Sequence, residues 1–116
     1  MTSEQIYLET LTNGGSSTNR LNQKPTAGYM VSVPDESVIV PIDDREAAIE
    51  AISAHRKSIA QRTHLPYYVG TWVDNGQIFI DVSVQIDNLE HALDVGRTFE
   101  QIAIYDVVNQ QSINCY

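Results

Sequence analysis

Two strand-like runs meet at the dipeptide Asn75-Gly76 in the stretch GTWVDNGQIFIDVSV, residues 70–84, and this feature constrains the fold most. Asn-Gly favours a type I′ turn because that turn requires positive φ at both of its central residues. The runs on either side are rich in β-branched and aromatic residues, which favour strands. The sequence therefore predicts a β-hairpin with a two-residue loop.

The two-residue loop also fixes which residues of the two strands face each other. On one face we expect core contacts from Val73 with Ile78, Thr71 with Ile80, Val69 with Val82 and Tyr67 with Val84. On the second face the predicted pairs are Asp74 with Gln77, Trp72 with Phe79, Gly70 with Asp81 and Tyr68 with Ser83. A face that mixes aromatic rings and carboxylates is half exposed to water, buried, or in contact with a partner.

The length of 116 residues predicts a single domain with a core of two layers. Further short strands are predicted at 28–34, 37–42 and 102–108. Two amphipathic helices are predicted, one starting at Asp43 with Glu46 and ending near residue 62, the other starting at Asp87 with Glu90 and ending near Phe99. The resulting order β-β-α-β-β-α-β predicts an α+β two-layer sandwich, with a mixed or mainly antiparallel sheet and both helices on one face.

The two ends of the chain show no clear periodicity. Residues 3–11 fit neither the helix nor the strand period, and residues 12–28 form a polar stretch rich in Gly, Ser and Asn. We therefore predict an irregular N-terminal arm and polar linker over 1–27, followed by an α+β domain over 28–116. The last residues, NQQSINCY, are predicted to be a turn and a tail.

The charge of the chain is strongly negative and unevenly distributed. Fifteen acidic residues oppose seven basic ones, and the net charge of -8 argues against direct binding to nucleic-acid phosphates. Residues 66–116 contain a single base, Arg97. We expect Asp87, Glu90 and Asp94 to form the outer stripe of the second helix.

No motif for catalysis or for metal or cofactor binding is recognisable. The three histidines lack metal-ligand spacing, and His55 is expected to be structural. Cys115 is the penultimate residue, where a shaped catalytic pocket is not expected. The apolar run at 38–42 is too short to span a membrane, and the lone cysteine fits a reducing compartment, so we expect a cytoplasmic protein. Because no catalytic motif is recognisable, we expect that it is not an enzyme.

The segments YYVGTWVDNGQIFIDVS and QIAIYDVVNQQSI resemble a family of small uncharacterised proteins found in bacterial genomes and mobile elements. The likeness covers roughly residues 28–113, and its motifs are structural. By size and charge the chain is also similar to phage-encoded inhibitors of host defence systems. The family brings no established activity with it, and the likeness to phage inhibitors is an analogy of size and charge that implies a role in protein interaction.

The leading hypothesis is a small acidic interaction protein, an accessory or inhibitor of a larger protein such as a nucleic-acid-binding host enzyme. The alternative is a domain that binds a small ligand or nucleotide on its aromatic sheet face. The sequence also leaves open whether the protein forms a homo-oligomer. The expected contact residues are Tyr68, Trp72, Phe79, Asp81, Asp87, Glu90 and Asp94.

Overall fold

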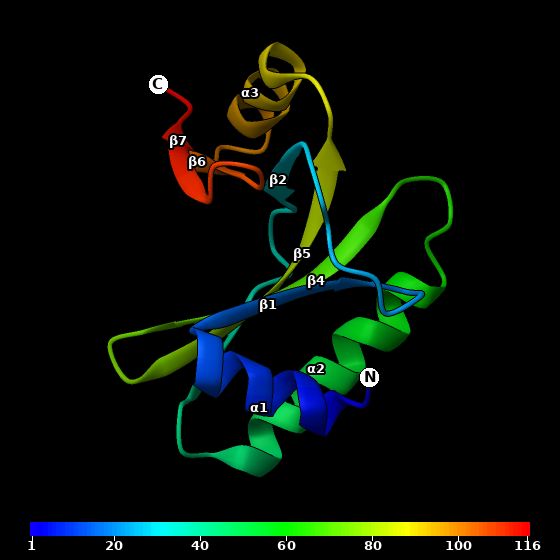
Figure 1. Ribbon diagram of the computed structural model, residues 1–116, viewed down its shortest axis with the longest axis vertical. Helices are drawn as coiled ribbons and strands as arrows, with labels where there is room; N and C mark the ends of the chain where they lie inside the picture. Colours follow the sequence, from blue (N-terminus) through cyan, green and yellow to red (C-terminus); the bar gives the residue numbers. More distant parts are fainter.

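The computed structural model describes residues 1–116 and contains three helices and seven strands (Figure 1). The elements are α1 (Ser3–Asn13), β1 (Gly15–Asn19), β2 (Tyr29–Ser32), β3 (Val38–Pro41), α2 (Arg45–Ala60), β4 (Tyr67–Asp74), β5 (Gln77–Ile86), α3 (Leu89–Thr98), β6 (Ala103–Asp106) and β7 (Gln111–Asn114). The strands form one antiparallel sheet in the order β1-β4-β5-β2-β6-β7, and β3 also pairs with β5. The predicted α+β class is confirmed.

The β4–β5 hairpin has the predicted turn and the predicted register. Asn75 and Gly76 have φ of 51° and 75°, the positive values that a type I′ turn requires. All eight predicted pairs are present, from Asp74 with Gln77 to Tyr67 with Val84. Local turn chemistry therefore sets the register of the central hairpin.

Strands β2 and β3 share one edge of β5 and do not pair with each other. Strand β3 pairs with residues 77–80 of β5, and β2 pairs with residues 83–86. Val33 N still donates to Val82 O of β5 at 2.8 Å. The chain then leaves the sheet as a loop before it returns as β3. The long strand β5 therefore pairs with β3 along its first half and with β2 along its second half.

Two hydrophobic cores lie at opposite ends of β5 (Figure 1). The larger core joins α1, α2 and the hairpin, and its members are Ile6, Tyr7, Val40, Ala48, Ile52, Ile59, Val69, Ile78, Ile80 and Val82. The smaller core lies under α3 and contains Val31, Ala92, Ile104 and Cys115. Val31 is the register partner of Val84, which shares its sheet face with Val82, so both cores lie on the same face.

The predicted irregular N-terminal arm is wrong over residues 3–19, which form α1 and β1, while residues 20–28 are a linker without helix or strand. A capping box between Thr2 and Gln5 starts α1, and Gly14, with φ of 82°, ends it in the left-handed conformation. The buried face of α1 is short and includes Thr10, whose hydroxyl lies 2.5 Å from the Thr71 hydroxyl. A buried polar side chain that finds its partner far along the chain leaves no apolar period in the sequence.

The predicted helix starts are each displaced by one residue. Asp44 accepts from Ala47 N at 3.1 Å and caps α2, where Asp43 was expected. Asn88 accepts from His91 N at 2.9 Å and caps α3, where Asp87 was expected. In both cases the neighbouring residue is also a good cap, so composition alone did not decide between them.

The C-terminal segment is not a tail, because residues 111–114 form β7 beside β6. Its polar side chains are exposed at the sheet edge, while Cys115 is fully buried in the smaller core. Arg97 Nε donates to Cys115 O at 2.6 Å and holds this end in place. No helix in the structure has the length and apolar character that crossing a membrane requires.

Candidate functional site

The second face of the sheet carries an exposed aromatic pair near the hairpin tip. The Trp72 and Phe79 rings are stacked with their centroids 4.1 Å apart and an angle of 9° between their planes. Ile39 is the register partner of Phe79 on the adjacent strand β3. Trp72 is 44% exposed and Ile39 is 52% exposed, and we call these three residues the aromatic patch.

Exposed carboxylates lie at the hairpin tip, on one side of the aromatic patch. Asp74 is exposed at the end of β4, directly before the turn. Ile42 N donates to Gly76 O at 3.0 Å, which holds the exposed Asp43 and Asp44 near the same tip. Arg45 is the nearest base in the sequence, and it forms an ion pair with Glu4 at 2.9 Å. The patch is therefore an apolar surface with a negatively charged edge at the hairpin tip, and we call this edge the rim.

Asp81 lies farther along the second face and is buried. Its carboxylate accepts a hydrogen bond from the Ser32 hydroxyl at 2.9 Å, and a longer one from the Ser83 hydroxyl at 3.5 Å. A Cβ atom on Gly70 would lie 2.5 Å from Asp81 Oδ1, so glycine makes room for the carboxylate. Burial raises the pKa of Asp81, and the two hydroxyl donors offset part of this effect.

Replacing Asp81 by Asn should stabilise the protein near pH 7, on the order of 1 kcal/mol. Because the native pKa is raised, the contribution of Asp81 to stability is fully present below its unfolded pKa. This contribution is lost as pH rises through the native pKa. Urea unfolding between about pH 4 and pH 7 should therefore show a gain for Asp81→Asn that grows with pH.

The exposed Asp74→Asn variant is the control, and it should change stability by less than about 0.5 kcal/mol. A gain for Asp81→Asn that is equal at both pH values would contradict the account of the buried carboxylate.

Tyr68 occupies a covered part of the second face. It is 6% exposed, and its hydroxyl donates to Gln85 Oε1 at 3.4 Å. The linker at residues 20–28 crosses β4 and β5 on its way to β2 (Figure 1), and Gln85 Nε2 donates to Ala27 O at 2.5 Å. The linker thus covers this end of the second face and leaves the aromatic patch open.

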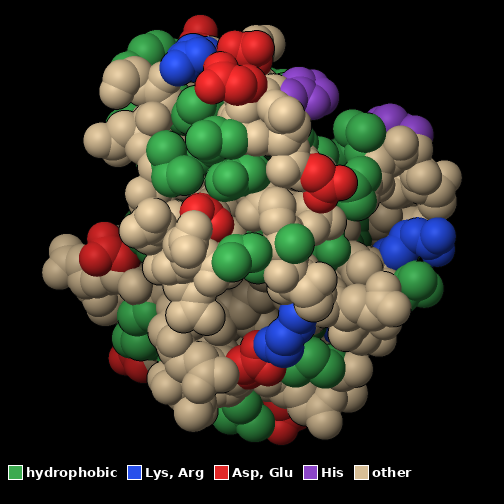
Figure 2. Space-filling model, turned by 45° about the horizontal axis from the view of Figure 1, so that its top comes forward, with side chains coloured by type: hydrophobic (Ala, Val, Ile, Leu, Met, Phe, Trp, Pro, Cys, Tyr) green, Lys and Arg blue, Asp and Glu red, His purple; other side chains and the backbone are tan.

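The predicted acidic residues of α3 form a separate surface. Asp87, Glu90 and Asp94 are all exposed, and Asp94 forms an ion pair with Arg97 at 3.4 Å. Figure 2 shows acidic side chains beside a basic one at the top of the molecule, where Figure 1 places α3. Eight residue steps along the chain, from Phe79 in β5 to Asp87, place this surface roughly 26 Å from the aromatic patch. The predicted contact residues therefore fall into two groups, with Tyr68 and Asp81 buried between them.

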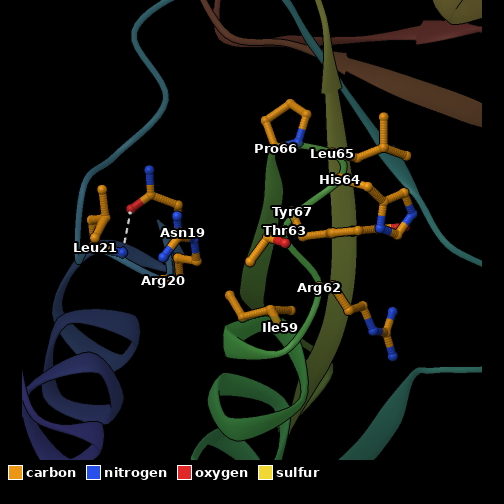
Figure 3. A pocket seen from close by; sticks show the side chains of 10 residues that line it. All are labelled: Asn19, Arg20, Leu21, Ile59, Arg62, Thr63, His64, Leu65, Pro66 and Tyr67. Atoms are coloured by element: carbon orange, nitrogen blue, oxygen red, sulfur yellow. Dashed lines mark hydrogen bonds between the residues drawn. The ribbon is translucent and has the colours of Figure 1, made fainter.

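A cavity of about 340 Å³ lies beside the end of α2, between the turn after β1 and the start of β4 (Figure 3). Arg20, Arg62 and His64 are among its lining residues, which suggests an anion site. However, Arg62 makes a two-pronged ion pair with Glu36, and its hydrogen bonds lower the pKa of Glu36. Figure 3 shows the Arg62 and His64 side chains directed away from Asn19 and Leu21, so the bases do not converge.

His55 has a structural role. His55 Nδ1 lies 2.9 Å from Ala51 O, and its Nε2 lies 2.6 Å from Glu36 O, so the ring joins α2 to the loop before β3. No three histidine, cysteine, aspartate or glutamate side chains are arranged to hold a metal ion.

The sequence matches no family model, no curated protein and no solved structure.

Proposed function

We propose that the protein is a non-enzymatic interaction protein that docks the aromatic patch onto a larger protein. The observation that supports this proposal is the exposed Trp72–Phe79 stack on an open part of the sheet. Aromatic side chains in contact surfaces bury a large area at little entropic cost, and tryptophan is enriched among residues that dominate binding energy. The register of three paired strands holds the patch in one shape before binding.

The charge of the rim indicates the chemistry of the partner. Exposed carboxylates at Asp43 and Asp74 favour a partner whose contact surface is apolar at its centre and basic around it. A net charge of -8 would also steer such a partner toward this protein. The nucleic-acid groove of an enzyme has such basic chemistry, so an accessory or inhibitory role on an enzyme of this kind fits the surface.

The alternative of a planar ligand between Trp72 and Phe79 has less support. The two rings already contact each other face to face, so no slot is open between them. A ligand would have to bind on top of the pair, where only one side of it would be covered. A protein partner can bury a larger area of such an open surface than a small ligand can.

The test begins with capture of the partner from a bacterial lysate, followed by affinity measurement with the purified pair. The variant Trp72→Ala should weaken binding by about tenfold or more, because truncating a central aromatic residue removes a large buried area. The matched control is Val108→Ala, which truncates an exposed apolar side chain in the turn between β6 and β7 and should leave affinity unchanged. Circular dichroism should show that both variants are folded.

Two further variants separate the two acidic surfaces. Asp43→Asn with Asp74→Asn should slow association and flatten its salt dependence if the rim faces the partner. Glu90→Gln with Asp94→Asn tests the α3 surface in the same way. Equal affinity for wild type and Trp72→Ala, combined with a slower rate for the α3 variant, would move the contact from the aromatic patch to α3.

A further inference from the structure

The free edges of the sheet differ in how well they are closed. Strand β7 lies at one end of the strand order and β1 at the other, and β3 has a third free edge because it pairs only with β5. A free edge presents unpaired backbone N–H and C=O groups, with which a strand of another molecule can pair. An edge that nothing blocks is therefore a place where a second chain can join the sheet.

Two of the three edges are blocked. On β3, Ile42 N donates to Gly76 O, and the alternation of an antiparallel ladder then turns Pro41 outward, where proline has no N–H to donate. On β1, the outward N–H of Asn19 already donates to Gln23 O at 2.9 Å, so the turn after the strand occupies part of this edge. Neither edge presents a complete set of unpaired groups to a second chain.

The edge of β7 carries no such block. Cys115 N donates to Ile102 O at 2.8 Å, so the same alternation directs the backbone groups of Ile113 toward β6. The N–H and C=O groups of Ser112 and Asn114 then point away from the sheet, and none of the turn and loop hydrogen bonds reaches them. Figure 1 shows β7 on the outer side of β6. Strand β7 thus offers a second chain an open backbone edge.

The C-terminal segment that contains β7 has no charged side chain. Residues 107–116 read VVNQQSINCY, although the chain as a whole has a net charge of -8. Natural edge strands are commonly protected by charged side chains, above all lysine, or by proline, and β7 has neither. Two copies of a chain with this net charge repel each other least where the contacting segments are neutral. Charge therefore favours β7 as the contact between two copies.

The smaller core beside β7 is incompletely covered. It contains four buried residues, and Ile113 packs at its margin, where it is only partly buried. Val108 in the turn before β7 is 67% exposed, and Ile102 opposite the end of β7 is 80% exposed. A second strand beside β7 would cover Ile113 and remove further apolar surface from water. Because the contact is small, the association is expected to be weak.

We infer that β7 pairs with β7 of a second copy of this chain, in an antiparallel arrangement that continues the sheet across the dimer. Ser112 faces Asn114 of the second copy, and each such pair exchanges both of its backbone hydrogen bonds. Ile113 faces Ile113 of the second copy on the two-fold axis, so the two smaller cores meet on one face of the sheet. This contact does not depend on the proposed function, because the aromatic patch lies on β3, β4 and β5.

Sedimentation velocity of the full chain tests for self-association between about 10 µM and about 1 mM, the range that suits a small contact. The average mass should rise from 13.0 kDa toward twice that value. In the ¹⁵N-labelled protein, hydrogen exchange of the Ser112 and Asn114 amides should slow several-fold as the concentration rises, because pairing protects them. The Gly15 and Ser17 amides on the edge of β1 are the internal control and should exchange at a constant rate.

Two variants and a matched control locate the contact. Ser112→Glu places a negative charge at the neutral edge and should keep the protein monomeric, whereas Ser112→Gln, which has the same shape without the charge, should associate like the wild type. Ser112→Pro removes an outward N–H group and should also prevent association. Circular dichroism should show that all three variants are folded, because Ser112 is exposed. A wild type that is monomeric at every concentration, or association that Ser112→Glu and Ser112→Pro leave unchanged, would overturn the inference.

Discussion

Replacing Ile6 by Ala should lower the free energy of unfolding by about 2–5 kcal/mol. Ile6 is fully buried, and its side chain packs α1 against the larger core. The smaller side chain loses apolar contact and leaves a cavity, because α1 is also held by β1 on β4 and cannot move in to fill it. Urea unfolding should show a lower midpoint with an unchanged slope.

Leu8→Ala on the same helix is the matched control. Leu8 is 48% exposed, so its truncation should change stability by less than about 0.5 kcal/mol. The comparison separates burial from helix propensity, because both variants place alanine inside α1. Similar small losses for the two variants would show that α1 is not docked on the core.

The hairpin could be predicted in full because its determinants are local. Asn75 and Gly76 define the turn, and the turn defines every pair along β4 and β5. The pairing of Trp72 with Phe79 on the second face followed directly. Short-range turn chemistry thus predicted both the centre of the sheet and the core of the candidate site.

The ends of the chain could not be predicted because their burial depends on distant partners. Thr10 and Thr18 are buried although they are polar, and Thr10 meets Thr71 through a long-range contact. At the other end, Cys115 is buried by Gly96 and Ile104. Neither pattern produces a periodic apolar signal, so residues 3–11 fitted neither a helix nor a strand, and the C-terminal segment was interpreted as a turn and a tail.

The candidate site was predictable only in part for the same reason. Ile39 joins the aromatic patch because β3 pairs with β5, and nothing local in the sequence indicates this pairing. Tyr68 is covered because the linker crosses its end of the sheet, although a polar linker is usually expected to be solvated.

Replacing Gly96 by Val should destabilise the protein by about 2–3 kcal/mol, because the new side chain has no room. Gly96 is buried within α3, and a Cβ atom there would lie 2.7 Å from Cys115 Sγ and 3.0 Å from Ile104 Cγ2. Valine adds two methyl groups beyond that atom. The close approach of α3 to β6 and to the end of β7 therefore requires glycine, and thermal or urea unfolding measures the cost.

The double variant Gly96→Val with Cys115→Ala tests whether the thiol is the obstacle. Cys115→Ala alone should cost about 1 kcal/mol, because it removes a buried sulfur from the smaller core. Together the two substitutions should cost less than the sum of their separate effects, by about 1 kcal/mol, because alanine leaves space for part of the valine. Strictly additive losses would place the clash at Ile104 alone. A stable Gly96→Val variant would instead mean that α3 does not lie this close to the C-terminal strand.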